Sequence, residues 1–162
     1  MSPQPTSHLP SIDPSAPGTI IRTALLFESV TTIGAGLYFL LLPHRYLLTT
    51  MGASTTQTTT TAVQMTQQFG AANILVGTVV GLFVSNSRKS IEARQTLYVV
   101  LLVFELCYVP LLLWQALMDG GMPRKAFLDA VKMFVVFVAW RGFTIGWKPE
   151  WFGRCVEGRK RE

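Results

Sequence analysis

The sequence predicts an all-α integral membrane protein, built as a compact bundle of four transmembrane helices with both termini in the cytoplasm. Apolar residues make up 49% of the 162 residues, and charged residues only 14%, well under the usual quarter. The apolar residues cluster in four long segments. Most basic residues lie at the ends of these segments and in the C-terminal tail, where membrane topology places them.

The N-terminal part of the chain is predicted to be a disordered tail followed by the first transmembrane helix. Residues 1–18 are rich in proline, which favours a flexible, partly extended chain. The first helix extends from about Thr19 to Leu42 and ends at Pro43. Its one acidic residue, Glu28, shares a helical face with other polar and small residues. We therefore expect Glu28 to point inward, toward the other helices.

The second predicted helix follows a Thr-rich, solvated loop at residues 47–63 and spans about Gln64 to Ser85. Gly77 and Gly81 form a GxxxG motif, which lets another helix approach closely. Asn73 lies on the same stripe near the middle of the membrane. Because water is absent there, its amide is expected to need a partner across a helix interface.

The third predicted helix, Leu97 to Leu117, follows a short basic loop at residues 85–94. It is long enough to cross a bilayer, which takes about 20 mostly apolar residues. Glu105 lies near its middle. Placing an ionised carboxylate at that depth in a bilayer costs at least about 2–3 kcal/mol of free energy. Pro110 frees a backbone carbonyl and is expected to kink the helix. A glycine- and proline-containing turn at residues 118–124 ends this hairpin.

The fourth predicted helix spans about Lys125 to Gly146. Asp129 and Lys132 are three residues apart near its start and are expected to form a salt bridge. Arg141 lies near its other end, on the opposite face from Lys132. Residues 147–162 then form an aromatic, interfacial and basic cytoplasmic tail.

Charge predicts the orientation and the membrane. Most basic residues lie in or next to the two tails and the 85–94 loop. The positive-inside rule therefore places both termini in the cytoplasm. The chain then divides into the tail 1–18, the transmembrane domain 19–146 and the cytoplasmic tail 147–162. Arg159 and Lys160, the fourth and third residues from the C-terminus, resemble a dibasic retrieval signal and predict the endoplasmic reticulum.

Glu28 and Glu105 are the candidate catalytic residues. Both helices rise from the cytoplasmic side, and the carboxylates lie about 12 Å and about 13–15 Å from the helix starts. They are therefore expected to share one low-dielectric layer, where burial and mutual repulsion keep a protonated acid beside an ionised base. Such a pair suits acid/base isomerisation, cyclisation or epoxide opening on a lipophilic small molecule.

Four further polar residues are candidates for substrate binding: Asn73, Tyr108, Arg141 and Gln68. Arg141 is also placed to keep one carboxylate ionised. No Cys or His spacing matches a metal site, and the sequence predicts no cofactor and no disulfide. No basic patch or recognition motif indicates nucleic acid. The expected partners are a lipophilic substrate and membrane lipid. The sequence leaves open whether the chain also forms a homodimer.

The first predicted helix ends in LLLPHR and the second contains QQFGAANILVG. On these stretches the four-helix layout resembles small DoxX-like membrane proteins. The chain also resembles the small membrane proteins of fungal natural-product pathways, some of which are cyclases, isomerases or epoxide-opening enzymes. In the seven-helix membrane terpene cyclases of such pathways, acidic residues within the helices protonate the substrate. Glu28 and Glu105 resemble that arrangement in kind, and the resemblance implies a proton-transfer enzyme without assigning its site residues.

Other interpretations remain open at this stage. Glu28 and Glu105 can instead lock helices together, and Asn73 can serve packing. Arg141 can extend its side chain to the cytoplasmic headgroups. The protein is then a non-enzymatic membrane adaptor or subunit. A transporter formed by a dimer is a third alternative, although no repeat of discontinuous helices supports it.

Overall fold

The computed structural model describes residues 11–13, 16–118 and 123–156, and these residues are almost entirely helical. The four long helices are α1 (Thr19–Leu41), α3 (Thr60–Leu82), α4 (Arg88–Leu117) and α5 (Arg124–Trp147). The short helical segments are α2 (Pro43–Arg45), the π-helical turn η1 (Tyr46–Thr50) and the 3-10 turn η2 (Pro149–Phe152). Two-residue strands β1 (Ser11–Ile12) and β2 (Cys155–Val156) form an antiparallel pair.

Two of the predicted loops are shorter in the structure, because hydroxyl side chains start the next helices earlier. Thr59 caps α3, and Ser87 caps α4. In each case the side-chain oxygen accepts a hydrogen bond from the backbone N–H three residues later, at 3.2 Å. This is the usual N-cap geometry. The Thr-rich loop therefore ends before residue 60, and the helix that contains Glu105 begins within the predicted 85–94 loop.

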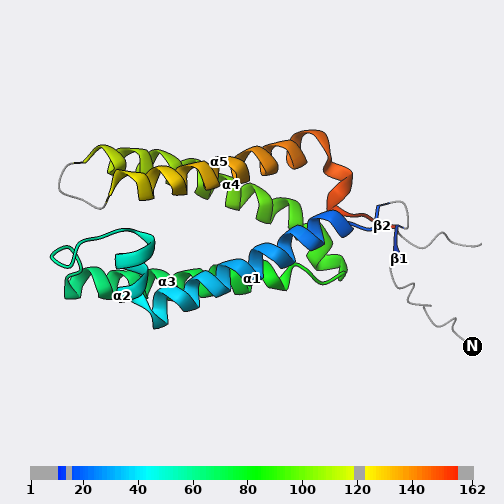
Figure 1. Ribbon diagram of the computed structural model, residues 1–162. Coiled ribbons are helices and arrows are strands. Elements are labelled where there is room, and N and C mark those ends of the chain that lie inside the picture. Colours follow the sequence, from blue (N-terminus) through cyan, green and yellow to red (C-terminus); the bar gives the residue numbers. More distant parts are fainter. Residues whose placement is uncertain (1–10, 14–15, 119–122, 157–162) are drawn as a thin grey trace, which may run out of the picture.

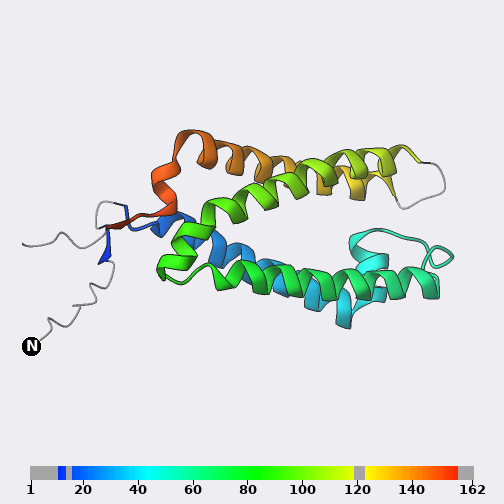
Figure 2. The ribbon, with the colours of Figure 1, turned by 180° about the vertical axis from the view of Figure 1, so that it is seen from behind.

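The long helices form two antiparallel pairs, α1 with α3 and α4 with α5. Figures 1 and 2 show that the two pairs lie close together at the end that carries β1 and β2 and diverge toward the opposite end. The four helices were predicted to pack as one compact bundle, and this part of the prediction was wrong. The molecule consists of two helical hairpins that meet at one end.

Glycines bring α1 and α3 into close contact. A Cβ atom added to Gly36 or to Gly70 would lie 2.7 Å from the carbonyl oxygen of the other. Further along, the Ser29 hydroxyl donates a hydrogen bond to the Gly77 carbonyl at 2.7 Å. A Cβ atom on Gly81 would lie 2.8 Å from the same hydroxyl. The GxxxG motif thus packs within the chain, against α1, and is not left free for a partner.

Arg94 holds the end at which the two pairs meet. Its side chain is fully buried and donates to the carbonyls of Phe83, Ser85 and Phe152 and to the side chain of Asn86, at 2.8–3.1 Å. These bonds satisfy carbonyls at the C-terminal end of α3, where cations are favoured. Sequence reasoning counted Arg94 only as a loop charge, and this residue instead joins α3, α4 and η2.

The segment before α1 is more ordered than predicted. Of residues 1–18, the structure describes 11–13 and 16–18, and there Ser11 and Ile12 pair with β2. Gly18, which has a positive φ of 67°, sits against Arg94 and the carbonyl of Phe152. The predicted retrieval signal at Arg159 and Lys160 lies outside the described residues.

Within the described part of the chain, α1 and α4 are the two helices long and apolar enough to cross a membrane. Only 17% of the apolar window of α1 and 28% of that of α4 is buried inside the protein. Apolar side chains such as Phe27, Val136 and Trp114 point outward and are about two-thirds exposed. Since soluble proteins rarely expose large apolar patches, this surface indicates association with a membrane.

Candidate functional site: a buried arginine between two carboxylates

Arg141 on α5 joins Glu28 on α1 to Glu105 on α4. Its Nε donates to Glu105 Oε1 at 2.8 Å, and its Nη2 donates to Glu28 Oε1 at 2.5 Å. The side chains of Arg141 and Glu105 are only 2% and 5% exposed, and that of Glu28 is 18% exposed. The cluster therefore links both helix pairs, and Glu28 is its most accessible member.

Tyr98 forms one wall of this cluster. The central carbon of the Arg141 guanidinium lies 4.9 Å from the centroid of the Tyr98 ring, within the range of a cation–π contact. Tyr98 is fully buried and packs edge-on against Phe152 of η2. Since Tyr98 and Glu105 are two helical turns apart on α4, they share one face. Tyr98 and Glu105 therefore reach the same guanidinium from one helix.

Three buried polar atoms of this cluster lack a close, well-aligned hydrogen bond among the described residues: Tyr98 Oη, Glu105 Oε2 and Arg141 Nη1. The indole N–H of Trp140 approaches Tyr98 Oη, but it can only donate, so the O–H of Tyr98 has no acceptor. Buried polar atoms are nearly always paired, so each exception calls for an explanation. Here the three belong to side chains that contact one another through Arg141. They offer one carboxylate acceptor, the N–H donors of the guanidinium and one hydroxyl that can donate or accept.

Of the sequence-predicted site residues, the structure brings together Glu28, Glu105 and Arg141. The others make no hydrogen bond or ion pair with this cluster in the described structure. Asn73 donates to the carbonyl of Phe69 on its own helix at 2.8 Å, so the expected partner across a helix interface is not used. Gln68 is exposed.

Tyr108, the remaining candidate, lies one turn beyond Glu105 on α4. Its ring is half-buried, stacked on Phe104 and edge-on to Phe134. These contacts give it an aromatic packing role between α4 and α5.

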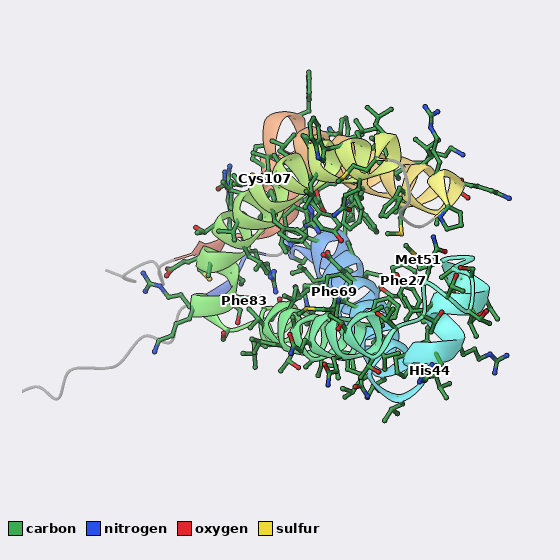
Figure 3. The ribbon with its side chains drawn as sticks, turned by 90° about the vertical axis from the view of Figure 1, so that its left-hand side faces the viewer. Phe27, His44, Met51, Phe69, Phe83 and Cys107 are labelled. Atoms are coloured by element: carbon green, nitrogen blue, oxygen red, sulfur yellow. The ribbon has the colours of Figure 1, made fainter. Side chains whose placement is uncertain are left out.

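Other charged and titratable groups lie outside the cluster. The predicted Asp129–Lys132 salt bridge is present at 2.8 Å and is exposed. His44 is exposed on α2, at the edge of the lower helix pair in Figure 3. Cys107 and Cys155 are both free. Among the described residues, no group of three or more His, Cys, Asp or Glu could hold a metal ion.

Sequence reasoning missed Tyr98, although a signal was present. The face of α4 that contains Glu105 continues by one spacing of seven residues to Tyr98. For Arg141, the sequence left open whether the guanidinium reaches headgroups or a carboxylate. The structure shows it buried between two carboxylates.

The fold and this cluster define an all-helical protein with two helices able to cross a membrane and a buried, charged centre. Comparison with protein families, curated proteins and solved structures finds no match for the chain.

Proposed function

We propose that this chain is a cofactor-independent membrane enzyme of natural-product biosynthesis. It performs acid/base isomerisation, cyclisation or epoxide opening on a lipophilic small molecule, with Glu105 as the general acid or base and Glu28 as its partner. The observation that carries the proposal is the buried cluster of Glu28, Arg141 and Glu105. Charged groups at membrane depth are costly and mark functional sites by default.

The charge of the cluster suits proton transfer. Two carboxylates and one guanidinium add up to one negative charge in a largely apolar environment. Because an uncompensated buried charge is expensive, the uptake of one proton makes the cluster neutral and is favoured by burial. Glu105 Oε2, which has no partner among the described residues, is the atom on which a substrate proton would arrive.

The proposal includes four membrane spans with both termini in the cytoplasm, in the endoplasmic reticulum. The long helices have 23, 23, 30 and 24 residues. At 1.5 Å per residue these lengths exceed the hydrocarbon thickness of about 30 Å. The basic residues near the termini and in the α3–α4 connection support the orientation. A C-terminal tag that is accessible only from the lumen would exclude it.

Untargeted metabolite profiling of the source cells tests the function. Wild type is compared with a deletion strain, with Glu105→Gln, and with Glu92→Gln, an exposed carboxylate on the same helix, at matched protein levels. We expect the deletion and Glu105→Gln to accumulate one lipophilic precursor, and Glu92→Gln to match wild type. A lost product of equal mass indicates isomerisation or cyclisation, and a product heavier by one water indicates hydrolysis. A wild-type profile in Glu105→Gln refutes the mechanism.

A second function, that of a non-enzymatic membrane adaptor or subunit, is favoured by one observation. Arg141 binds a carboxylate from each helix pair, an arrangement that also serves as a lock between them. In that case Glu105→Gln lowers the amount of protein or of its complexes in the membrane and has no separate effect on any metabolite.

A further inference from the structure

The three buried polar atoms of the cluster indicate which hydrogen-bonding groups a ligand at this place would carry. Tyr98, Glu105 and Arg141 are each more than nine-tenths buried, so water has little access to them. Arg141 Nη1 and the O–H of Tyr98 are donors without an acceptor, and Glu105 Oε2 is an acceptor without a donor. A group with an oxygen atom for the donors and an acidic hydrogen for the carboxylate would satisfy all three.

Resting on the proposed function, we infer that the substrate is a neutral, lipophilic ketone with an enolisable carbon. Its carbonyl oxygen accepts hydrogen bonds from Arg141 Nη1 and Tyr98 Oη, and its α-hydrogen faces Glu105 Oε2. A carboxylate or phosphate is disfavoured, because the cluster already carries one negative charge. An apolar substrate without oxygen would leave the buried donors unpaired, which is unfavourable.

The reaction step is a proton transfer that needs no co-reactant. The α C–H bond breaks, its proton binds Glu105 Oε2, and its electron pair forms a carbon–carbon double bond as the carbonyl becomes an enolate. The negative charge moves from Glu105 to the enolate oxygen, where the guanidinium and the hydroxyl of Tyr98 stabilise it. When Glu105 returns the proton to the same carbon, the ketone is regenerated and the step is visible only as hydrogen exchange. In an enone, Glu105 can instead return the proton to the far carbon of the dienolate, and the product is then an isomer.

The same donors suit epoxide opening less well. Epoxide opening requires that an acid transfers a proton fully to the ring oxygen. Arginine does not lose its proton in proteins, and Tyr98 would become a buried tyrosinate beside two carboxylates. Glu105 would have to be the acid, but its Oε1 accepts a hydrogen bond from Arg141 Nε at 2.8 Å, which favours the carboxylate that enolisation uses. Enolisation requires only that Arg141 and Tyr98 donate hydrogen bonds, so both keep their protons.

Deuterium exchange tests this inference on the purified full chain in phosphatidylcholine nanodiscs in heavy water. The probes are three lipophilic ketones, β-ionone, α-tetralone and isophorone, and mass spectrometry measures deuterium uptake at the enolisable carbons. We expect wild type to accelerate exchange of at least one probe and Glu105→Gln to abolish the acceleration. Tyr98→Phe keeps the ring under Arg141 and loses only the hydroxyl, so we expect exchange to fall by about 100-fold, as for one oxyanion donor.

The matched control is Tyr38→Phe, which removes a tyrosine hydroxyl that contacts only Thr49 and Thr50 among the described residues and should exchange at the wild-type rate. Wild-type protein that accelerates none of the three probes overturns the ketone inference, and so does a Tyr98→Phe variant equal to wild type. If exchange fails while Glu105→Gln cells still accumulate a precursor, the proposed function stands and only the ketone is excluded. If both fail, the enzyme proposal falls as well.

Discussion

Replacement of Arg141 by methionine is expected to be strongly destabilising. The Arg141 side chain is 2% exposed, and its two carboxylate partners are 5% and 18% exposed. Removal of one partner from a buried ion pair costs about 3–5 kcal/mol, because the remaining charge is left uncompensated. Arg141→Met leaves two such carboxylates on different helix pairs, so we expect a loss of at least about 3 kcal/mol in the free energy of unfolding.

Equilibrium unfolding of the purified full chain in detergent, followed by far-UV circular dichroism, measures this loss. Lys132→Met is the matched control on the same helix, because Lys132 is 77% exposed and pairs with Asp129 at the surface. We expect this variant to remain close to wild type, since surface pairs contribute little. Adding Glu105→Gln to Arg141→Met should recover part of the stability, because it removes one of the uncompensated charges. If Arg141→Met and Lys132→Met are equally stable, the buried cluster does not exist as described.

Two other predictions concern packing and membrane embedding. Gly70→Ala should cost about 1–3 kcal/mol by overpacking, since its Cβ would lie 2.7 Å from the Gly36 carbonyl oxygen. Gly142→Ala, with nothing within 4 Å of the added Cβ, should not destabilise the chain, and equal losses in thermal unfolding would contradict the α1–α3 contact. A membrane-impermeant maleimide applied to opened microsomes should label Cys155, at the end of the helices. It should spare Cys107, which is exposed on α4, if lipid covers that helix. Rapid labelling of Cys107 would show that α4 is not embedded.

The four long helices could be predicted because their signals are local. Pro43 ends the first helix, and the glycines and proline of residues 118–124 separate the last two. Apolar segments of 20 residues or more are recognisable without knowledge of their neighbours. The helix starts were missed by up to nine residues, as for α4 at Arg88 against the expected Leu97. The missed turns are polar, so no apolar pattern marks them. In the structure α4 runs through them from the N-cap residue Ser87.

The pairing of the helices and the exact partners of the site could not be predicted. Periodicity shows which face of a helix is polar but not which helix that face meets. Glu28 and Glu105 were expected at one depth, and a single guanidinium does reach both. Arg141 can be buried because two carboxylates from distant segments, Glu28 and Glu105, lie at the same level along the helices. No pattern within α5 contains that information.

The number of charges in the cluster separates a lock from a proton-transfer site. One carboxylate is enough to neutralise Arg141 and to join two helices. The second gives the buried cluster a net negative charge, which costs free energy. A lock between the two helix pairs needs only the ion pair of Arg141 with Glu28, because Glu105 belongs to the same helix pair as Arg141. Glu28→Gln removes this excess charge and keeps an amide oxygen that can accept from Arg141 Nη2. If the second carboxylate serves chemistry, this variant should be at least as stable as wild type and still accumulate precursor. If it instead destabilises the chain as much as Arg141→Met, both carboxylates are structural and the adaptor function is the better explanation.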